Sequence, residues 1–439
     1  MEILIKVAQL ILSLSILVIL HEFGHFILAK LFNTRVEKFY LFFNPGFSLF
    51  KFRKGETEYG MGWLPLGGYV KISGMIDESM DKDQMKKPPQ PYEFRSKPSW
   101  QRLLIMLGGV MMNFILAILI YASILFVWGE QYLPADNVKH GIAADSLAES
   151  IGFQDGDKVV SVEGKKVERF SEIPKSILLN KANHVTVQRN GQRETIHIPD
   201  TLFPKIINNP GFISYRVPTV IGGFSENSPA KQTGLQKGDR IVQINGKDVK
   251  YFDQLREELK DKKNEEISLK VQRDGELKEY NLTTTSDGLI GFYVGNVNDY
   301  YEFEEVNYSF VAAIPAGIDK GIETFREYLK QLGLIFTPDT EAYKEVGGFI
   351  TIGNIFPGTW NWYAFWNLTA FLSIILAILN VLPIPALDGG HVMFLLYEIV
   401  SGQKPSEKFL EYAQIAAMLI LFSILIYANG NDIVKLFSN

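Results

Sequence analysis

The residues with the clearest catalytic potential lie near the start of the chain, where the sequence reads His21-Glu22-Phe23-Gly24-His25. Side chains four residues apart lie on one face of a helix, so His21 and His25 can bind one metal ion. This His-Glu-x-x-His spacing is typical of zinc sites in which the glutamate acts as general base in peptide hydrolysis. The chain contains no cysteine, so a transition metal must be held by histidine and carboxylate side chains.

A candidate for the third zinc ligand lies near the other end of the chain. Two histidines leave a catalytic zinc ion short of one protein ligand, because such sites usually combine three protein ligands with one open position. The segment NVLPIPALDGG at 380–390 places an acid, Asp388, at the end of an apolar stretch that two prolines interrupt. The expected zinc ligands are therefore His21, His25 and Asp388, with Glu22 as general base.

The remaining histidines are not expected to bind the metal. His391 follows Asp388 by three residues, but a fourth protein ligand would close the position that catalysis needs. We interpret His391 as a residue behind the ligands or at the membrane interface. The other three lie in the soluble part of the chain and are interpreted as surface or core residues: His140, His184 and His197.

The elements that carry these motifs are predicted to cross a membrane. Of the 439 residues, 47% are apolar, and four stretches approach the roughly 20 apolar residues that a transmembrane helix needs. They run over residues 3–32, 103–127, 363–382 and 412–427. A cleavable signal peptide is the competing interpretation of the first stretch, but its basic N-region is weak and no A-x-A-like site follows. Trp360, Trp362 and Trp366 are interpreted as membrane-interface anchors.

The charge distribution predicts which loop faces the cytoplasm. The loop 33–101 is rich in lysine and arginine close to the membrane, which favours the cytoplasmic side. These basic residues are Arg35, Lys38, Lys51, Arg53, Lys54, Lys71, Lys86 and Lys87. The termini and the segment 129–359 then lie outside. Because the first and third spans run in the same direction, His25 and Asp388 are expected at similar depths near the cytoplasmic side.

The outer segment contains an internal repeat. Residues 146–167 align without gaps on 228–249, and 185–194 align on 269–278. Each copy is predicted to combine a short helix, a strand, a second helix and a hairpin closed at Asn-Gly or Asp-Gly. The second copy resembles PDZ domains, and the first is a looser match of the same kind. Such domains bind an extended peptide at a sheet edge; spacers or lids without a ligand are the alternative.

Together, these motifs resemble the site-2 protease family, in particular bacterial regulator-of-sigma-E proteases of the RseP type with tandem PDZ domains. The resemblance rests on H-E-F-G-H in the first span, N-x-x-P-x-P-x-L-D-G at the third, and the repeat between the second and third. It implies a zinc endopeptidase of the bacterial inner membrane that cuts the transmembrane segment of single-pass proteins already trimmed outside by another protease. Anti-sigma factors and remnant signal peptides look like its substrates, and the PDZ pair would act as a size filter.

The resemblance also points to residues that bind the substrate. The stretch 64–71 is similar to the membrane-associated β-loop of the family, and residues 109–113 fit a G-x-x-x-N pattern. An unwound substrate helix needs replacement hydrogen bonds, which a strand edge and amide side chains offer. Ordinary tight turns and a helix-packing contact are the alternatives for the glycines and for the asparagine of the second span. The candidate substrate-binding residues are Asn380, Pro383, Pro385, Asn113, Gly67, Gly68 and Tyr69.

We therefore expect a polytopic α-helical membrane protein with about four transmembrane helices, a membrane-associated β-loop at 51–75 and two inserted α+β PDZ domains. Helices are also expected between the second PDZ domain and the third span, either on the membrane surface or as a short pair. The expected boundaries are 1–128, 129–215, 216–300, 301–362 and 363–439.

Other function classes fit the sequence less well. The formal net charge of −5 and the lack of a dense basic stripe argue against a nucleic-acid partner. A scaffold whose PDZ pair only captures extracytoplasmic C-termini would not need intact metal-binding motifs. A transporter that binds a passing ion would more naturally show inverted repeats among its spans, and we recognise none in the sequence. The expected partners are transmembrane substrates and the lipid bilayer.

Overall fold

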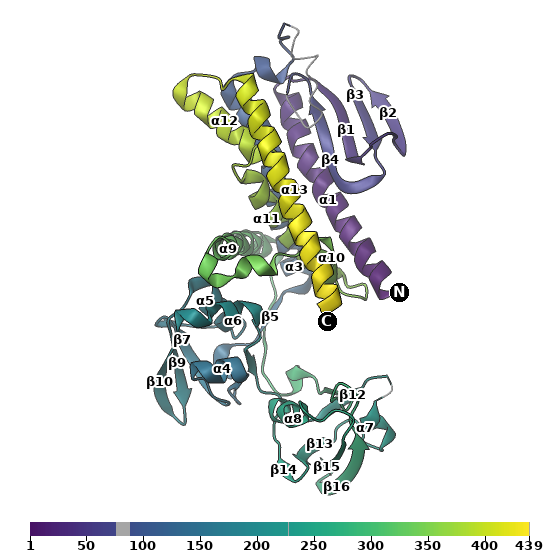
Figure 1. Ribbon diagram of the computed structural model, residues 1–439, viewed down its shortest axis with the longest axis vertical. Helices are drawn as coiled ribbons and strands as arrows, with labels where there is room; N and C mark the ends of the chain where they lie inside the picture. Colours follow the sequence, from purple (N-terminus) through teal and green to yellow (C-terminus); the bar gives the residue numbers. More distant parts are fainter. Residues whose placement is uncertain (76–87, 227, 439) are drawn as a thin grey trace. The chain divides into compact units, whose positions relative to one another are not determined.

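The computed structural model describes residues 1–75, 88–226 and 228–438 and separates the chain into two compact units (Figure 1). The first, called the membrane unit below, comprises Met1–Gly129, Asn307–Phe336 and Tyr343–Asn439. The second, called the repeat unit, comprises Glu130–Val306 and Thr337–Ala342. Two of the basic residues behind the predicted sidedness, Lys86 and Lys87, lie outside the described residues. The sidedness stays a prediction.

Four long helices dominate the membrane unit (Figure 1). They are α1 (Glu2–Leu31), α3 (Ser99–Trp128), α11 (Trp362–Val381) and α13 (Glu407–Ser438). Each is long and apolar enough to cross a membrane, so the four predicted spans are confirmed as continuous helices. Helix α13 extends beyond the predicted 412–427 at both ends, because polar residues there interrupt the apolar pattern without ending the helix.

Helices α1 and α3 touch through their backbones where glycines face each other. A Cβ atom added to Gly24 would lie 2.1 Å from the carbonyl oxygen of Gly108, and one added to Gly108 would lie 2.5 Å from that of Gly24. No side chain fits at this crossing, and small residues are what allow membrane helices to approach so closely. The crossing holds the His-Glu-x-x-His segment of α1 directly against α3.

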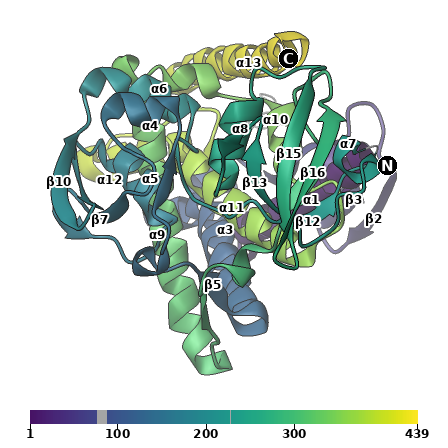
Figure 2. The ribbon, with the colours of Figure 1, turned by 90° about the horizontal axis from the view of Figure 1, so that it is seen from below.

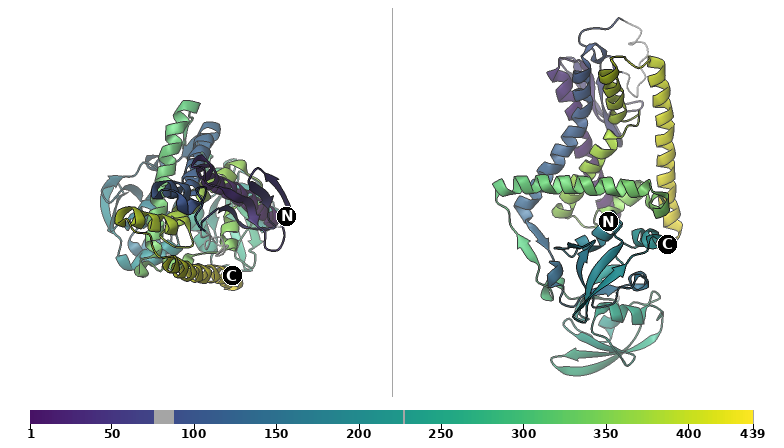
Figure 3. Two further views of the ribbon diagram at one scale, coloured as in Figure 1. Left: turned by 90° about the horizontal axis from the view of Figure 1, so that it is seen from above. Right: turned by 90° about the vertical axis from the view of Figure 1, so that its left-hand side faces the viewer.

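The described residues of the membrane unit form three further α-helices. They are α9 (Phe310–Ile335), α10 (Phe349–Ile355) and α12 (Asp388–Ser401). Helix α9, predicted around 314–334, lies across the direction of the long helices (Figure 3). Helix α10 is tied to α13, because the Asp432 carboxylate accepts hydrogen bonds from the amides of Ile350 and Thr351 at 3.0 and 3.1 Å. Helix α12 is absent from the sequence-based expectation, since Gly389 and Gly390 at its start are poor helix formers.

A four-stranded sheet packs beside α1. Its strands are β1 (Val36–Phe43), β2 (Phe50–Lys54), β3 (Thr57–Met61) and β4 (Leu64–Ile72), in the order β2-β3-β1-β4. Among the described strands, β4 therefore lies at the edge of the sheet and pairs antiparallel with β1 only. The predicted β-loop at 51–75 misses β1, whose side chains are partly buried on both faces and so show no clear alternation of apolar and polar residues.

The repeat unit contains two modules of the same construction (Figure 2). The first has α4 (Ser146–Ile151), β7 (Lys158–Val162), β8 (Lys165–Lys166), α5 (Glu172–Asn180), β9 (His184–Arg189) and β10 (Gln192–His197). The second has α7 (Pro229–Gln232), β13 (Arg240–Ile244), β14 (Lys247–Asp248), α8 (Phe252–Leu259), β15 (Glu266–Arg273) and β16 (Glu276–Thr283). The sheet orders β10-β9-β7-β8 and β16-β15-β13-β14 are equivalent, and each module has its own apolar core. The order of elements predicted for each copy is confirmed.

Short strand pairs and one helix complete the repeat unit. The pairs are β5 (Glu130–Tyr132) with β18 (Glu304–Val306), β6 (Ile142–Ala144) with β11 (Ile213–Tyr215), and β12 (Ile221–Phe224) with β17 (Phe292–Val294). The helix is α6 (Phe203–Asn208). The chain thus returns to the first module after the second: β18 pairs with β5, and Tyr301 is buried in the first core. Residues 301–306, which the sequence assigns to the linker, complete the first module.

Arg216, between the two modules, links them through its side chain. Its guanidinium lies 3.0 Å from Asp155 of the first module and 2.6 Å from Asp253 of the second, and it stacks over the ring of Tyr251. The hydroxyl of Tyr251 lies 3.2 Å from Nδ1 of His140. Arg216 is itself buried, with 7% of its surface exposed, so both carboxylates neutralise a desolvated charge.

Candidate functional site

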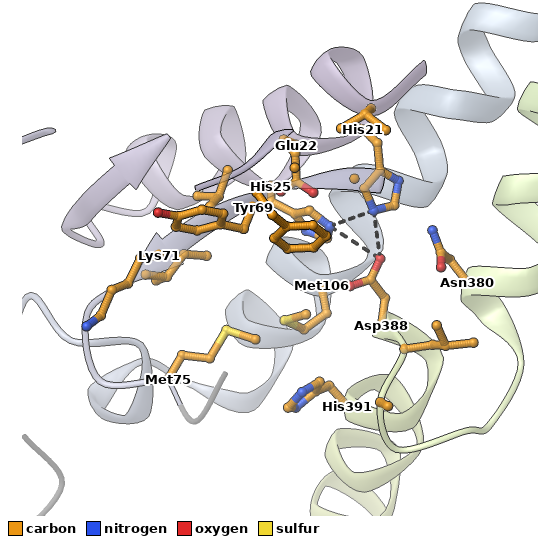
Figure 4. A pocket seen from close by; sticks show the side chains of 18 of the residues that line it. His21, Glu22, His25, Tyr69, Lys71, Met75, Met106, Asn380, Asp388 and His391 are labelled. Carbon is orange, nitrogen blue, oxygen red and sulfur yellow. Dashed lines mark hydrogen bonds and ion pairs between the residues drawn. The ribbon is translucent and has the colours of Figure 1, made fainter. Parts of the chain in front are cut away.

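The three predicted zinc ligands converge in the membrane unit. His21 and His25 project from α1 toward Asp388, the first residue of α12 (Figure 4). The Asp388 Oδ2 atom lies 3.1 Å from Nε2 of His21 and 3.3 Å from Nε2 of His25, and the two Nε2 atoms are 3.2 Å apart. Three potential metal ligands from opposite ends of the chain thus form a nearly equilateral triangle.

The dimensions of this triangle fit zinc. With Zn–N and Zn–O bonds of about 2.0–2.1 Å, neighbouring ligands of a tetrahedral site are roughly 3.3 Å apart, which matches the three distances above. The Asp388 Oδ2 atom is buried and has no hydrogen-bond partner among the described residues, as expected for an atom that would bind a cation. These three residues form the candidate metal-binding group of the described chain.

Contacts behind the histidines leave their Nε2 atoms available for a metal. Nδ1 of His25 lies 2.8 Å from the backbone carbonyl oxygen of Ile105, so this nitrogen carries the proton and donates it. Nδ1 of His21 lies 3.3 Å from the side-chain amide of Asn113 on α3. Such partners fix the ring orientation and the tautomer of metal-binding histidines.

A glycine on α3 makes room for both imidazole rings. A Cβ atom added to Gly109 would lie 2.4 Å from Nε2 of His25 and 2.7 Å from Nε2 of His21. These distances are far below van der Waals contact, so any side chain at this position would displace the ligand atoms. Gly109, singled out in the sequence only as the start of a G-x-x-x-N pattern, is therefore part of the wall behind the metal site.

The reversal between α11 and α12 places Asp388. Helix α11 ends at Val381, and Leu382 adopts an extended conformation before Pro383, as residues preceding proline prefer. The chain then folds back so tightly that a Cβ atom on Gly389 would lie 2.3 Å from the carbonyl oxygens of Val381 and Leu382. The prolines end helix α11, and the glycines allow the two backbone segments to pack closely. This explains how the segment places an acid at the start of the next helix.

A cavity of about 640 Å³ surrounds the triangle, and Glu22 lines it. Six consecutive residues of β4, Gly67 to Ile72, also line this catalytic cavity. Because alternate residues of a strand point to opposite faces, a cavity that meets six in a row runs along the edge of the strand. Gly68 brings this edge close to Glu22, since its added Cβ would lie 3.4 Å from Cγ of that side chain. Glu22 and the strand edge thus line one cavity (Figure 4).

The predicted substrate-binding residues are distributed around this site. Gly67, Gly68 and Tyr69 lie on β4, and the Tyr69 ring is stacked between those of Tyr40 and Phe43. Their role in binding a substrate stays a prediction.

The other candidates come from α3 and from α11 with the turn after it. Asn380, near the end of α11, lines the catalytic cavity, and so does Asn113, although its side chain also contacts His21. Pro385 lines an adjoining cavity, whereas Pro383 is exposed and lines neither of the two cavities described here. His391 is outside the triangle and lines the cavity below Asp388 (Figure 4).

Gln414 is a polar residue of the cavity wall that the sequence analysis did not identify. Gln414 on α13 is buried, with 7% of its surface exposed, and lines the catalytic cavity. A single carboxamide near the start of an otherwise apolar span is costly in a membrane and usually functional. The presence of this polar side chain in an apolar span could have indicated a functional role for Gln414, although Gln414 belongs to no recognisable motif.

The comparisons with known proteins agree with this geometry. The model of the family described as "Peptidase family M50" matches residues 9–424. The regulator of sigma E protease of Haemophilus influenzae is 27% identical over 466 residues, covering 99% of this chain and all of the relative. The protease RseP of Yersinia pestis is 27% identical over 461 residues with the same coverage. A Neisseria meningitidis relative whose name describes a zinc metalloprotease is 28% identical over 448 residues, covering 97% of this chain and 98% of the relative.

The family model spans nearly the whole chain, and the relatives align with it from end to end. Both comparisons assign the chain to the same family. The zinc-sized triangle of ligands and the adjacent glutamate lie within the matched region. The chain belongs to peptidase family M50, the site-2 protease family, and is a membrane zinc metalloprotease.

Proposed function

We propose that this protease cuts within the transmembrane segment of single-pass membrane proteins that another protease has already trimmed. Its substrates in this proposal are anti-sigma factors and remnant signal peptides. The name of the Haemophilus influenzae relative, regulator of sigma E protease, supports the first class by analogy. The protein acts in the bacterial inner membrane, with its active site near the cytoplasmic side.

One observation carries the proposal: the metal triangle, the glutamate and an edge strand line the same cavity within a set of membrane helices. A transmembrane substrate is helical, and its carbonyl groups are engaged in hydrogen bonds within the helix. An unwound stretch can replace these bonds by pairing with β4, because an edge strand offers backbone amide and carbonyl groups to a further strand. The scissile bond would then lie between Gly68 and the triangle.

The residues of the site have different roles in the proposed reaction. His21, His25 and Asp388 would hold zinc, which when bound acidifies a water molecule and polarises the scissile carbonyl. Glu22 accepts the proton of the attacking water and passes it to the leaving nitrogen. Asn380 lies where its amide can bind an unwound substrate backbone beside the triangle (Figure 4).

The repeat unit is proposed to control which substrates reach this site. We interpret its modules as two PDZ domains on the outer side of the membrane. They would exclude proteins that still carry bulky outer domains. Replacing residues 130–306 by a short flexible linker should then permit cleavage of an untrimmed substrate. If cleavage of such a variant still required prior trimming, the filter would be rejected while the protease assignment stood.

The protease proposal is tested with a model single-pass substrate in detergent. Wild type and Glu22→Gln are compared for cleavage, and the zinc content of both is measured. We expect both to hold zinc and only the wild type to cut inside the transmembrane segment. Wild type with full zinc occupancy that cuts no trimmed substrate would contradict the proposal.

A further inference from the structure

A second cavity, of about 310 Å³, adjoins the catalytic cavity of the membrane unit. Met75, His391 and Gln414 line both cavities, so the two share a wall of three side chains. Figure 4 shows Met75 and His391 at the end of the catalytic cavity remote from His21. A polypeptide bound across the metal site can therefore continue past these residues into the second cavity.

The second cavity follows helix α12 away from the metal site. Asp388 begins this helix, and Phe394, Leu395 and Glu398, one to three turns further, line the cavity. Ten residues of helix span roughly 15 Å, which an extended chain covers with about four or five residues at ~3.3 Å each. The cavity thus corresponds to the part of a substrate three to five residues from the scissile bond.

Gln414 is poised to bind a peptide group between the two cavities. It is buried, with 7% of its surface exposed, yet no hydrogen bond joins its carboxamide to another residue of the described chain. The amide atoms themselves are accessible from the cavities, so they can bind a ligand there without giving up a hydrogen bond within the protein. A carboxamide carries one acceptor and two donors, which match the acceptor and donor of a peptide unit.

The remaining walls favour an apolar chain. Two charged residues of the lining are paired within the protein, since Arg102 lies 2.5 Å from Glu398, which also accepts a hydrogen bond from Ser99 at 3.0 Å. This pair therefore does not demand a charged ligand. Apolar side chains from several segments of the chain also line it: Met75, Phe94, Phe394, Leu395, Pro405 and Leu410.

We propose that the second cavity is a substrate subsite, which holds an apolar stretch of the unwound substrate three to five residues from the scissile bond, with Gln414 hydrogen-bonded to its backbone. This inference rests on the proposed protease function and extends it. It predicts that the protease contacts its substrate from α13 as well as from β4.

The absence of cysteine from the chain makes the test direct. Leu410→Cys, Val18→Cys and Tyr412→Cys are each made in the uncleaving Glu22→Gln protein. Leu410 lines only the second cavity, Val18 lines the catalytic cavity, and Tyr412 is exposed on the same helix two residues from Leu410. Each is oxidised with substrates that carry one cysteine, moved residue by residue along the transmembrane segment.

We expect Leu410→Cys to form a disulfide with substrate positions three to five residues from the bond that the wild type cuts, and Tyr412→Cys to form none. Val18→Cys should react with positions next to that bond. If wild type cuts and Val18→Cys reacts but Leu410→Cys does not, the subsite is rejected and the protease function stands. Equal reaction of Tyr412→Cys would also reject it. If wild type fails to cut and none reacts, the proposed function itself falls.

A kinetic measurement tests Gln414 separately. In the otherwise wild-type protease, Gln414→Leu should raise KM about five- to tenfold, the effect of roughly one hydrogen bond, with zinc content unchanged. Tyr412→Leu, the matched control on the exposed face, should leave KM unchanged. An unaltered KM in Gln414→Leu would remove Gln414 from the subsite.

Discussion

Asn113 on α3 and His21 on α1 meet behind the metal site, where the side-chain amide of Asn113 lies 3.3 Å from Nδ1 of His21. When Nε2 of His21 binds zinc, Nδ1 must carry the proton and needs an acceptor. The Oδ1 atom of Asn113 is buried and has no partner among the described residues. Rotating the side-chain amide of Asn113 by about 180° brings its Oδ1 atom to Nδ1 of His21, where it accepts the Nδ1 proton.

This pairing predicts that Asn113 sets the zinc affinity. Asn113→Leu should weaken zinc binding about 10- to 100-fold, the usual cost of losing such a partner, measured by competition with a chelator. Asn113→Asp, which keeps an acceptor, should retain zinc. Ser373→Ala is the control, because the Ser373 hydroxyl donates to the backbone carbonyl of Asn113 at 2.7 Å and leaves the side chain alone. Equal zinc loss in all three variants would show that Asn113 acts only in packing.

Gly109→Ala should abolish zinc binding although it adds a single methyl group. That methyl would lie 2.4 Å from Nε2 of His25, so the ring or the whole of α3 must move. Gly430→Ala on α13, where no other atom lies within 4 Å of the added carbon, is the matched control. Zinc content after purification distinguishes them, and a fully loaded Gly109→Ala protein would refute the close approach of α3 to the two histidine ligands.

Each repeat module should depend on one equivalent buried ion pair. Asp157 with Arg189 and Asp239 with Arg273 occupy matching positions, and both carboxylates are 1% exposed. Arg189→Leu would leave Asp157 buried and unpaired, at a cost of about 3 kcal/mol, and should lower the thermal unfolding temperature of the repeat unit. Arg193→Leu on the exposed strand β10 should change stability by less than about 0.5 kcal/mol. Similar melting of the two variants would contradict this role.

The contact between the modules should weaken in mild acid. Burial and the neighbouring positive charges of Arg216 and Arg240 lower the pKa of His140 below its ordinary value of 6.5. The folded protein therefore favours neutral His140, and this contribution to stability is present above about pH 6.5 and is lost as the pH falls through the lowered value.

The wild type should accordingly lose more thermal stability between about pH 7.5 and about pH 5 than His140→Gln does, as measured by the unfolding temperature of each protein at both pH values. His197→Gln, at an exposed position of β10, is the control and should follow the wild type. If acid lowers the thermal stability of His140→Gln and wild type equally, protonation of His140 does not weaken the contact between the modules.

The convergence of His21, His25 and Asp388 could be predicted from the sequence, because motif spacing and the direction of the spans can both be obtained from short stretches of sequence. The spacing of His21 and His25 fixes their common helix face, and the depth of Asp388 follows from the direction of its span. The repeat was equally accessible, since Asn190-Gly191 and Asp274-Gly275 mark corresponding hairpins. The spacing of motif residues and the lengths of the apolar stretches thus predicted most of the candidate site and the order of spans and repeats along the chain.

What could not be predicted depends on contacts between distant segments. The strand order β2-β3-β1-β4 makes β4 an edge, but no feature of residues 64–72 alone distinguishes an edge from a central strand. The partner of Asn113 depends on how α3 is rotated against α1, which Gly24 and Gly108 permit without specifying. Gln414 lines the cavity only because α13 folds back beside the rest of the membrane unit.

The open edge of β4 has a consequence for what this protease can recognise. Backbone hydrogen bonds are made by groups that every residue except proline possesses. Pairing with an edge strand therefore depends little on the side chains of the bound substrate. In the proposed mode of binding, cleavage would therefore depend mainly on how readily the substrate helix unfolds. A glycine that loosens the helix beside the scissile bond would mark a protein for destruction more strongly than any consensus sequence, and a proline at a position that must donate to β4 would protect it.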